Sequence, residues 1–247
     1  NIYENKMKNI FKGFALAVSM LTIIPFFKVH DFFKGINGYA VMFYPLIGFL
    51  LGSFLYYTHS FLSLYVEPLH VGIIIFSLWI LLTGALHLDG FSDTIDGLFV
   101  KKERALGVMK DPNTGGMGMI FTVTFLILKA SSLASLDALY LLPIIMMLSR
   151  LNAVLAIYKY PYVSPNGMST LAKEEFTLTQ LLVTIFYSLI LVYLFSSISL
   201  LISSVLILFV VKSFFIKRYG GFTGDIYGFS IEVTELILLN IILFGLA

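Results

Sequence analysis

Long apolar runs place the strongest limit on the folds open to this chain. Residues 39–64, 71–88 and 119–136 each hold about 18 or more residues with few charges, enough to cross a bilayer as a helix. In lipid, every backbone N–H and C=O group must be paired inside the protein, so only helices and closed barrels span it. The runs lack the apolar–polar alternation of barrel strands. The sequence therefore predicts an all-α, polytopic integral membrane bundle.

The composition agrees with this prediction. Apolar residues make up 59% of the chain and charged residues 12%, whereas soluble domains carry about 25% charged residues. The absence of cysteine excludes disulfides and thiolate metal sites. No short signal peptide precedes the first run, so we expect the hydrophobic N-terminal region to stay in the mature protein. We expect residues 1–247 to form one transmembrane domain whose partner is the lipid bilayer, with no nucleic acid.

The basic residues fall on one side of the predicted bundle. If the run Phe14–Phe27 lies at the interface or dips in and returns, 13 of the 16 Lys and Arg residues share one side. The other three lie inside apolar runs: Lys129, Arg150 and Lys212. The positive-inside rule then predicts about six crossings, a non-spanning N-terminal segment, and cytoplasmic loops at 97–118, 159–177 and 217–230.

Two features of the runs concern packing. Gly48 and Gly52 are small residues one helical turn apart, and we interpret them as a site where a neighbouring helix approaches closely. The run 178–216 is too long for one crossing, so we expect it to break near Ser196-Ser197.

Three aspartates follow the run 71–88 at spacings of four and three: Asp89, Asp93 and Asp96. At about 100° per residue they fall on one narrow stripe of a helix. Repelling carboxylates on one face require a cation, and hard oxygen ligands suit Mg²⁺, which is usually shared with substrate phosphates. The alternative is a solvated helix end. His87 and Asp89 adjoin the apolar run, where an ionisable group is costly, and this favours a functional site.

A second acidic group follows the glycine-rich loop 217–230 on the same predicted side. Asp225, Glu232 and Glu235 share a face if their helix begins near Asp225. Asp225 and Glu232 are therefore further candidate metal ligands, as is Asp111 of the earlier loop. The alternative for Glu232 and Glu235 is that they open the final helix and complement the dipole at its N-terminus.

Basic residues and glycines offer ways to bind phosphate. Glycines let backbone N–H groups approach an anion, and Lys110 or Arg218 can neutralise its charge. Lys129 and Arg150 lie in apolar runs that we expect to be adjacent antiparallel helices. They either form a structural pair with Asp137 or extend to an interface. The sharper hypothesis places them, Arg150 above all, in a polar cavity that binds a phosphate.

Together these motifs resemble the cobalamin synthase family, adenosylcobinamide-GDP ribazoletransferase. The matching stretches are His87-Leu88-Asp89-Gly90-x-x-Asp93-Thr94-x-Asp96-Gly97, Met109-Lys110-Asp111-Pro112 with Gly115 and Gly118, and Gly220-Gly221-x-Thr223-Gly224-Asp225-x-x-Gly228-x-x-x-Glu232-x-x-Glu235. The similarity extends to Pro25, Tyr44-Pro45-Leu46-Ile47-Gly48 and Arg150, so it covers almost the whole chain. The sequence departs from the family at Pro112, Phe229 and Phe91-Ser92, none of which is a candidate ligand.

The resemblance implies a Mg²⁺-dependent enzyme of the cell (inner) membrane with a single catalytic domain. It would join α-ribazole, or its phosphate, to adenosylcobinamide-GDP and release GMP, the last step of nucleotide-loop assembly in vitamin B12 synthesis. The three aspartates would hold the metal with Asp225, Asp111 or Glu232, and a carboxylate or His87 would accept the hydroxyl proton. The substrate-binding positions carried over are Lys110, Lys129, Arg150, Arg218, Gly115, Gly118, Gly221, Thr223, Gly224 and Glu235. A homo-oligomer and an association with other cobamide-synthesis enzymes are both left open.

Two other functions remain as alternatives. One is a different intramembrane transferase, either a CDP-alcohol phosphotransferase or an aspartate-rich prenyltransferase, although the Ala-Arg pair expected after the first Asp-Gly of the former is absent here. The other is an ion-coupled transporter in which Asp89, Lys129 and Arg150 line the path. The clustering of the aspartates at one predicted membrane face argues against transport.

Overall fold

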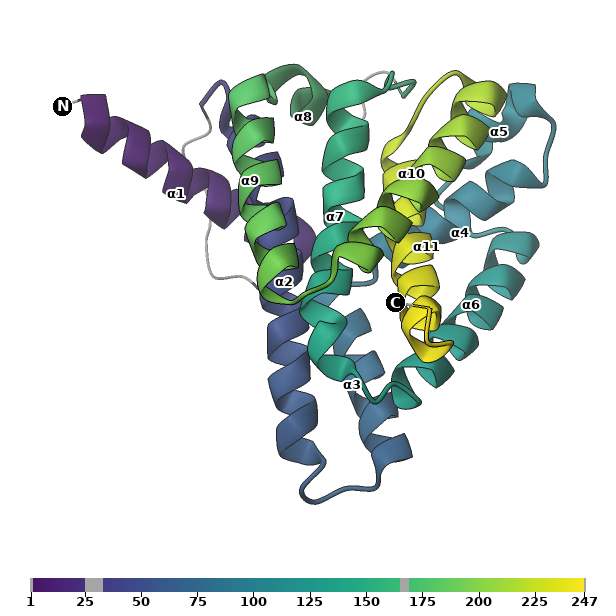
Figure 1. Cartoon of the computed structure of the whole chain (residues 1–247). Helices are drawn as coiled ribbons and strands as arrows, with labels where there is room; N and C mark the ends of the chain where they lie inside the picture. Colours follow the sequence, from purple (N-terminus) through teal and green to yellow (C-terminus); the bar gives the residue numbers. More distant parts are fainter. Residues whose placement is uncertain (1, 25–32, 165–168, 247) are drawn as a thin grey trace.

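Helices joined by loops build most of the described structure (Figure 1). The computed structural model describes residues 2–24, 33–164 and 169–246. Its elements in chain order are α1 (Ile2–Leu21), α2 (Ile36–Leu62), α3 (Pro68–Thr83), α4 (Leu86–Leu98), α5 (Lys102–Val108), α6 (Gly116–Ala134), the 3-10 turn η1 (Leu139–Leu141), α7 (Leu142–Lys159), α8 (Ser169–Glu175), α9 (Leu178–Leu194), α10 (Ile198–Tyr219) and α11 (Gly224–Leu243). The predicted all-α bundle is confirmed.

Five segments of the described chain are long and apolar enough to cross a membrane, and two bent helix pairs raise the number to as many as seven. The five are α2, α6, η1 with α7, α10 and α11, and the pairs are α3 with α4 and α8 with α9. The expected six crossings lie within this range. The number reaches seven only if each bent pair counts as one span.

The third apolar run does not lead straight into the aspartates. It ends at Thr83, and Gly84 and Ala85 both adopt left-handed backbone angles, with φ of 61° and 56°. Their N–H groups donate to Leu81 and Ile80, which closes the helix in the manner of a Schellman cap. After this break α4 turns by 85° from α3. The aspartate helix therefore runs across the direction of α3, and it is not itself one of the five helices long enough to span a membrane.

Helix α7 forms the centre of the bundle, because nearly all of its side chains are buried. Its closest neighbour is α2, and the two meet at Gly48 and Gly52. A Cβ on Gly48 would lie 2.4 Å from the Met146 carbonyl oxygen, and one on Gly52 would lie 2.5 Å from Pro143 Cα. The packing interpretation of these glycines is confirmed.

The loops are shorter than the sequence predicted. Loop 97–118 contains α5 and loop 159–177 contains α8, while loop 217–230 shrinks to residues 220–223 between α10 and α11. Glu232 and Glu235 therefore lie in the middle of α11, so the prediction that they open a helix is wrong. The break near Ser196-Ser197 is confirmed, because α9 ends at Leu194 and α10 begins at Ile198.

The N-terminal segment forms α1, which extends away from the side of the bundle in Figure 1. It is not among the described helices that could span a membrane, as predicted for the run Phe14–Phe27, although residues 25–27 of that run, including Pro25, lie outside the described residues. The helices of the basic loops, α5 and α8, lie at one end of the bundle, opposite the α2–α3 turn (Figure 1).

Candidate active site

The crossing of α4 and α11 brings the aspartates of two distant segments together. These helices pack closely because each of them has a glycine at the contact. A Cβ on Gly90 would lie 2.9 Å from the Asp225 carbonyl oxygen, and one on Gly228 would lie 3.1 Å from the His87 carbonyl oxygen. The close approach sets Asp89, next to Gly90, beside the start of α11.

A cavity of about 380 Å³ opens beside this crossing. Asp89 lines it from α4, Asp225 from the first turn of α11, and Lys110 from the loop after α5. The rest of the wall is mostly apolar and comes from α1, α2, α4, α7, α8, α11 and the segment that follows α7. The cavity thus combines a charged edge of two carboxylates and one lysine with an apolar interior, as in typical pockets for small molecules.

Asp93 adds a third carboxylate to the negative charge beside the cavity. It lies one helical turn after Asp89 and is half-buried. Burial, together with repulsion from Asp89, Asp225 and Asp96, raises the pKa of Asp93 to about 7. Since carboxylates on both helices contribute to this repulsion, a cation bound among them would relieve it.

Asp96 has a different role from its two neighbours. Its carboxylate accepts hydrogen bonds from the backbone N–H groups of Gly115 and Gly118, both at 2.7 Å. It thereby satisfies N–H groups at the start of α6 and complements the helix dipole. The prediction that three aspartates converge on one point is corrected, and the N–H groups of the two glycines are engaged by Asp96 rather than open to a phosphate.

His87 lines the same cavity, one turn before the cluster. Its side chain is buried and its Nδ1 has no hydrogen-bond partner among the described residues. Burial, with smaller contributions from Arg150 and Lys129, holds the pKa of His87 well below its usual range. The imidazole is therefore neutral at pH 7.

Asp111 and Arg218 lie away from the cavity wall. Asp111 is fully exposed and accepts hydrogen bonds from Asn113, at 3.0 Å from its backbone N–H and 2.8 Å from Nδ2. Those hydrogen bonds lower the pKa of Asp111. Arg218 Nη2 donates to the carbonyl oxygens of Leu98 and Val100 at 2.9 and 3.2 Å. Asp111 thus forms a turn and Arg218 fixes the C-terminal end of α4, and neither takes the predicted position at the site.

The glycine-rich loop before α11 shapes the site through its backbone. Thr223 is the N-cap of α11: its Oγ1 accepts from Ile226 N–H at 3.2 Å and lies 3.3 Å from Asp225 Oδ2. Gly221 packs against Pro161, where a Cβ would lie 2.4 Å from the carbonyl oxygen. Only Gly224 of the three predicted loop residues lines the cavity. Its place at a helix N-terminus suits an anion, because unpaired N–H groups gather there.

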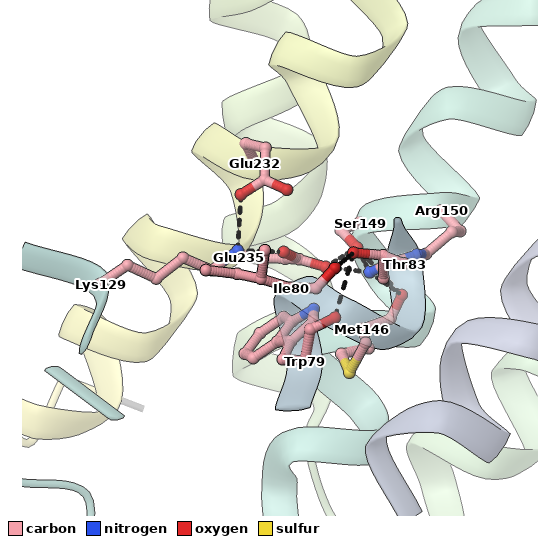
Figure 2. A network of polar contacts seen from close by, with 9 residues as sticks. All are labelled: Trp79, Ile80, Thr83, Lys129, Met146, Ser149, Arg150, Glu232 and Glu235. Atoms are coloured by element: carbon pink, nitrogen blue, oxygen red, sulfur yellow. Dashed lines mark hydrogen bonds and ion pairs between the residues drawn. The ribbon is translucent and has the colours of Figure 1, made fainter. Parts of the chain in front are cut away.

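Four charged residues predicted to bind metal or substrate form a buried network instead (Figure 2). Lys129 Nζ of α6 lies 2.6 Å from both Glu232 Oε2 and Glu235 Oε2 of α11. Arg150 of α7 pairs with the other oxygen of Glu235, and its Nη1 donates to Ser149 Oγ at 2.9 Å. Lys129 is 3% exposed and Arg150 1%. Two cations balance two carboxylates within the bundle.

This network corrects several predictions. Because α11 packs against both α6 and α7, Lys129 and Arg150 find partners on α11 rather than Asp137. The dipole interpretation of Glu232 and Glu235 is also wrong, since both are paired in mid-helix. None of the four lines the cavity. They hold three helices together and leave Asp89, Asp93 and Asp225 as the acidic residues at the site.

A divalent cation fits these aspartates only in part. Among the described residues no three His, Asp or Glu side chains gather closely enough to hold a metal ion. However, Asp89 and Asp225 both line the cavity, and burial together with repulsion from the neighbouring aspartates raises the pKa of Asp93. Such a donor set suits Mg²⁺, which keeps several waters and shares its site with substrate phosphates.

The aromatic wall of the cavity was missed from the sequence. Tyr162 follows α7 and Tyr227 lies in the first turns of α11, and both line the cavity. Tyr162 belongs to a short segment that pairs with the loop before α11 through an isolated β-bridge to Phe222. A signal was present in the tyrosines at positions 158, 160 and 162, next to a polar loop.

Comparisons with known proteins agree along the length of the chain. The sequence profile of the family described as cobalamin-5-phosphate synthase matches residues 13–243. The adenosylcobinamide-GDP ribazoletransferase of Desulforamulus reducens is 38% identical over 249 residues, which cover 96% of this chain and 98% of the relative. Proteins of the same name from Acinetobacter baumannii and Clostridioides difficile are 36% and 30% identical, covering 92% of this chain and 94% and 95% of their own length. No solved structure matches the chain significantly.

Proposed function

The chain belongs to the cobalamin-5-phosphate synthase family, and from this premise we propose that the cavity between α4, α5 and α11 is its active site. As a member of the family the protein is a transferase that catalyses the final assembly step of the cobalamin nucleotide loop. α-Ribazole, or its 5'-phosphate, is joined to adenosylcobinamide-GDP, and GMP is released. The observation that carries the assignment is the meeting of Asp89 and Asp225, from different helices, with Lys110 at one edge of the cavity.

The reaction requires charge neutralisation and positioning more than covalent help from the protein. A ribose hydroxyl oxygen of α-ribazole forms a bond to the phosphorus on the cobinamide side of the diphosphate. The bond from that phosphorus to the oxygen of GMP breaks, and GMP takes the electron pair. Lys110 faces the diphosphate at the cavity edge, and the N–H groups at the start of α11 contribute at Gly224.

Asp89, Asp93 and Asp225 would hold Mg²⁺ at this edge. Bound there with the diphosphate, the ion supplies charge neutralisation for the attacking and leaving oxygens. The support is the repulsion that Asp89, Asp225 and Asp96 exert on Asp93. Asp93 or the neutral His87 accepts the proton of the attacking hydroxyl. Asp96 keeps the cluster in place by fixing α4 to the start of α6.

We place this edge of the bundle in the cytoplasm and the chain in the cell membrane. The loops at the α5 and α8 end contain Lys101, Lys102, Lys110, Lys159 and Lys173, whereas segments 63–67, 135–141 and 195–197 at the other end contain no Lys or Arg. The positive-inside rule favours the basic end as the cytoplasmic one. Accessibility of single cysteines introduced at Lys101 and Asp137, in sealed right-side-out vesicles, tests this orientation.

An activity assay with purified protein tests the proposed function. The chain in detergent or nanodiscs receives adenosylcobinamide-GDP, α-ribazole and Mg²⁺, and nucleotide products are separated by chromatography. We expect GMP and a cobalamin product in equal amounts. Turnover of CDP-alcohol or prenyl donors with release of CMP or pyrophosphate instead would assign another transferase. Uptake by sealed vesicles without any chemistry would favour a transporter.

A further inference from the structure

A column of parallel aromatic rings ends at the cavity. Tyr160 stacks on Phe222 with ring centres 5.6 Å apart, Phe222 on Tyr227 at 5.4 Å, and Tyr227 on Tyr162 at 6.1 Å. The angles between successive ring planes are 13°, 16° and 10°. Tyr162 is the last ring of the column, it is half-buried, and it lines the cavity beside Tyr227.

The backbone holds Tyr162 in place without help from its ring. Phe222 N–H donates to the Pro161 carbonyl oxygen at 2.8 Å, and Val163 N–H donates to the Phe222 carbonyl oxygen at 2.9 Å. These bonds flank Tyr162 on both sides and form the β-bridge to Phe222. The ring is therefore held at the cavity wall in a fixed position. Ligand binding then costs little conformational entropy of the Tyr162 side chain.

The cavity has the size and polarity of a site for a nucleoside or nucleotide. Its volume of about 380 Å³ lies at the lower end of the range for small-molecule pockets. A corrinoid macrocycle with its side chains is far larger and stays outside. Asp225 interacts electrostatically with Asp89 and Lys110, so these three charged groups lie near one another in the cavity wall, and apolar side chains such as Leu21, Ile157 and Ile231 line other parts of it. A phosphate at the charged edge leaves the attached base among apolar and aromatic groups.

We propose that Tyr162 is the stacking platform for the planar base of a substrate. The proposal rests on the function assigned above and adds a residue that sets the position of the base relative to the reacting phosphate. A flat ring that lies on Tyr162 continues the column by one more ring. Stacking of a base on an aromatic side chain depends on ring area rather than on hydrogen bonds, so this contact selects for planar bases without reading their edges.

Two bases share this chemistry: the lower base of α-ribazole and the guanine of the donor. Kinetics of Tyr162→Leu with each substrate varied in turn separate them. We expect KM for one of the two substrates to rise by about 5- to 150-fold, the range that a stacking contact of about 1–3 kcal/mol represents. A rise confined to α-ribazole assigns the acceptor base to the platform, and a rise confined to the donor assigns guanine.

Two variants serve as controls. Tyr162→Phe keeps the ring and should retain the wild-type KM for both substrates. Tyr193→Leu removes a tyrosine that is 81% exposed near the far end of α9 and should leave both constants unchanged. Wild-type KM values in Tyr162→Leu, or a rise in KM in Tyr162→Phe equal to that in Tyr162→Leu, would overturn the proposal. The proposed function would still stand in that case, provided that the wild type releases GMP. An inactive wild type would instead count against the function.

A second measurement needs no variant. Saturation-transfer NMR on the wild-type protein with α-ribazole alone, and with GMP alone, reports which ligand protons lie against the protein. We expect the aromatic protons of one of these ligands to receive more saturation than its ribose protons. Ribose protons saturated as strongly as the base protons in both ligands would contradict stacking.

Discussion

The buried network of Figure 2 allows a quantitative prediction about stability. In Lys129→Met, Glu232 loses the only ion-pair partner that it has among the described residues, whereas Glu235 keeps Arg150 and Ser149. Glu232 is buried, so an unpaired charge there is strongly disfavoured. Removing one partner of a buried ion pair costs about 3–5 kcal/mol of stability, because the other charge is left buried and uncompensated.

The matched comparison is the double variant Lys129→Met with Glu232→Gln, which lacks the stranded carboxyl. We expect the single variant to be less stable than the double variant by about 3 kcal/mol, the lower end of that range. The sign follows because the double variant replaces the stranded carboxylate by a neutral amide, which costs less to bury.

Unfolding by SDS in mixed micelles measures this difference, because the chain carries its own reporter. Trp79 is the single tryptophan, and the Lys129 Nζ atom lies 4.2 Å from the centre of its ring. Its fluorescence follows the loss of the network, and far-UV circular dichroism checks that the helices unfold in the same transition. A single variant within about 1 kcal/mol of the double variant would refute the reasoning.

Two further predictions concern the aspartates. Asp89→Asn should reduce GMP release to background while the protein keeps its helix content. The control Asp111→Asn alters only an exposed turn and should stay close to the wild-type rate. Wild-type turnover in Asp89→Asn would remove this residue from the site. The pKa of Asp93, raised to about 7 from an ordinary value of 3.8, makes the folded chain bind more protons there than the unfolded chain between those pH values. In metal-free buffer the thermal midpoint should therefore fall from pH 5 to pH 7.5 more steeply in the wild type than in Asp93→Asn, and equal slopes would show that Asp93 is not under this strain.

Much of the fold could be predicted because membrane spans leave a plain record in the sequence. The apolar runs located α2, α6, α7 and the pair α9–α10, since a helix in lipid needs about 20 apolar residues. The bend between α3 and α4 could not be read from the pattern. It depends on Ala85, which takes a left-handed backbone conformation that is unusual for a residue other than glycine.

The chemistry of the candidate site could be predicted from the sequence, but which residues form the site could not. Asp89 and Asp96 fall on one stripe, yet they are seven residues and thus about 10 Å apart along the helix axis, which lets α6 capture Asp96 alone. The partners of Lys129 lie 103 and 106 residues away. No local spacing reveals such pairs, because they form only when α11 packs between α6 and α7.

The most direct test of the central claim is the binding of a divalent cation where α4 meets α11. Mn²⁺ replaces Mg²⁺ as a paramagnetic probe, and electron paramagnetic resonance counts the ions retained by the purified protein in the presence of GDP. The account predicts that the wild type and Asp111→Asn retain Mn²⁺, and that Asp89→Asn and Asp225→Asn lose it. Equal retention in all four proteins would contradict the claim.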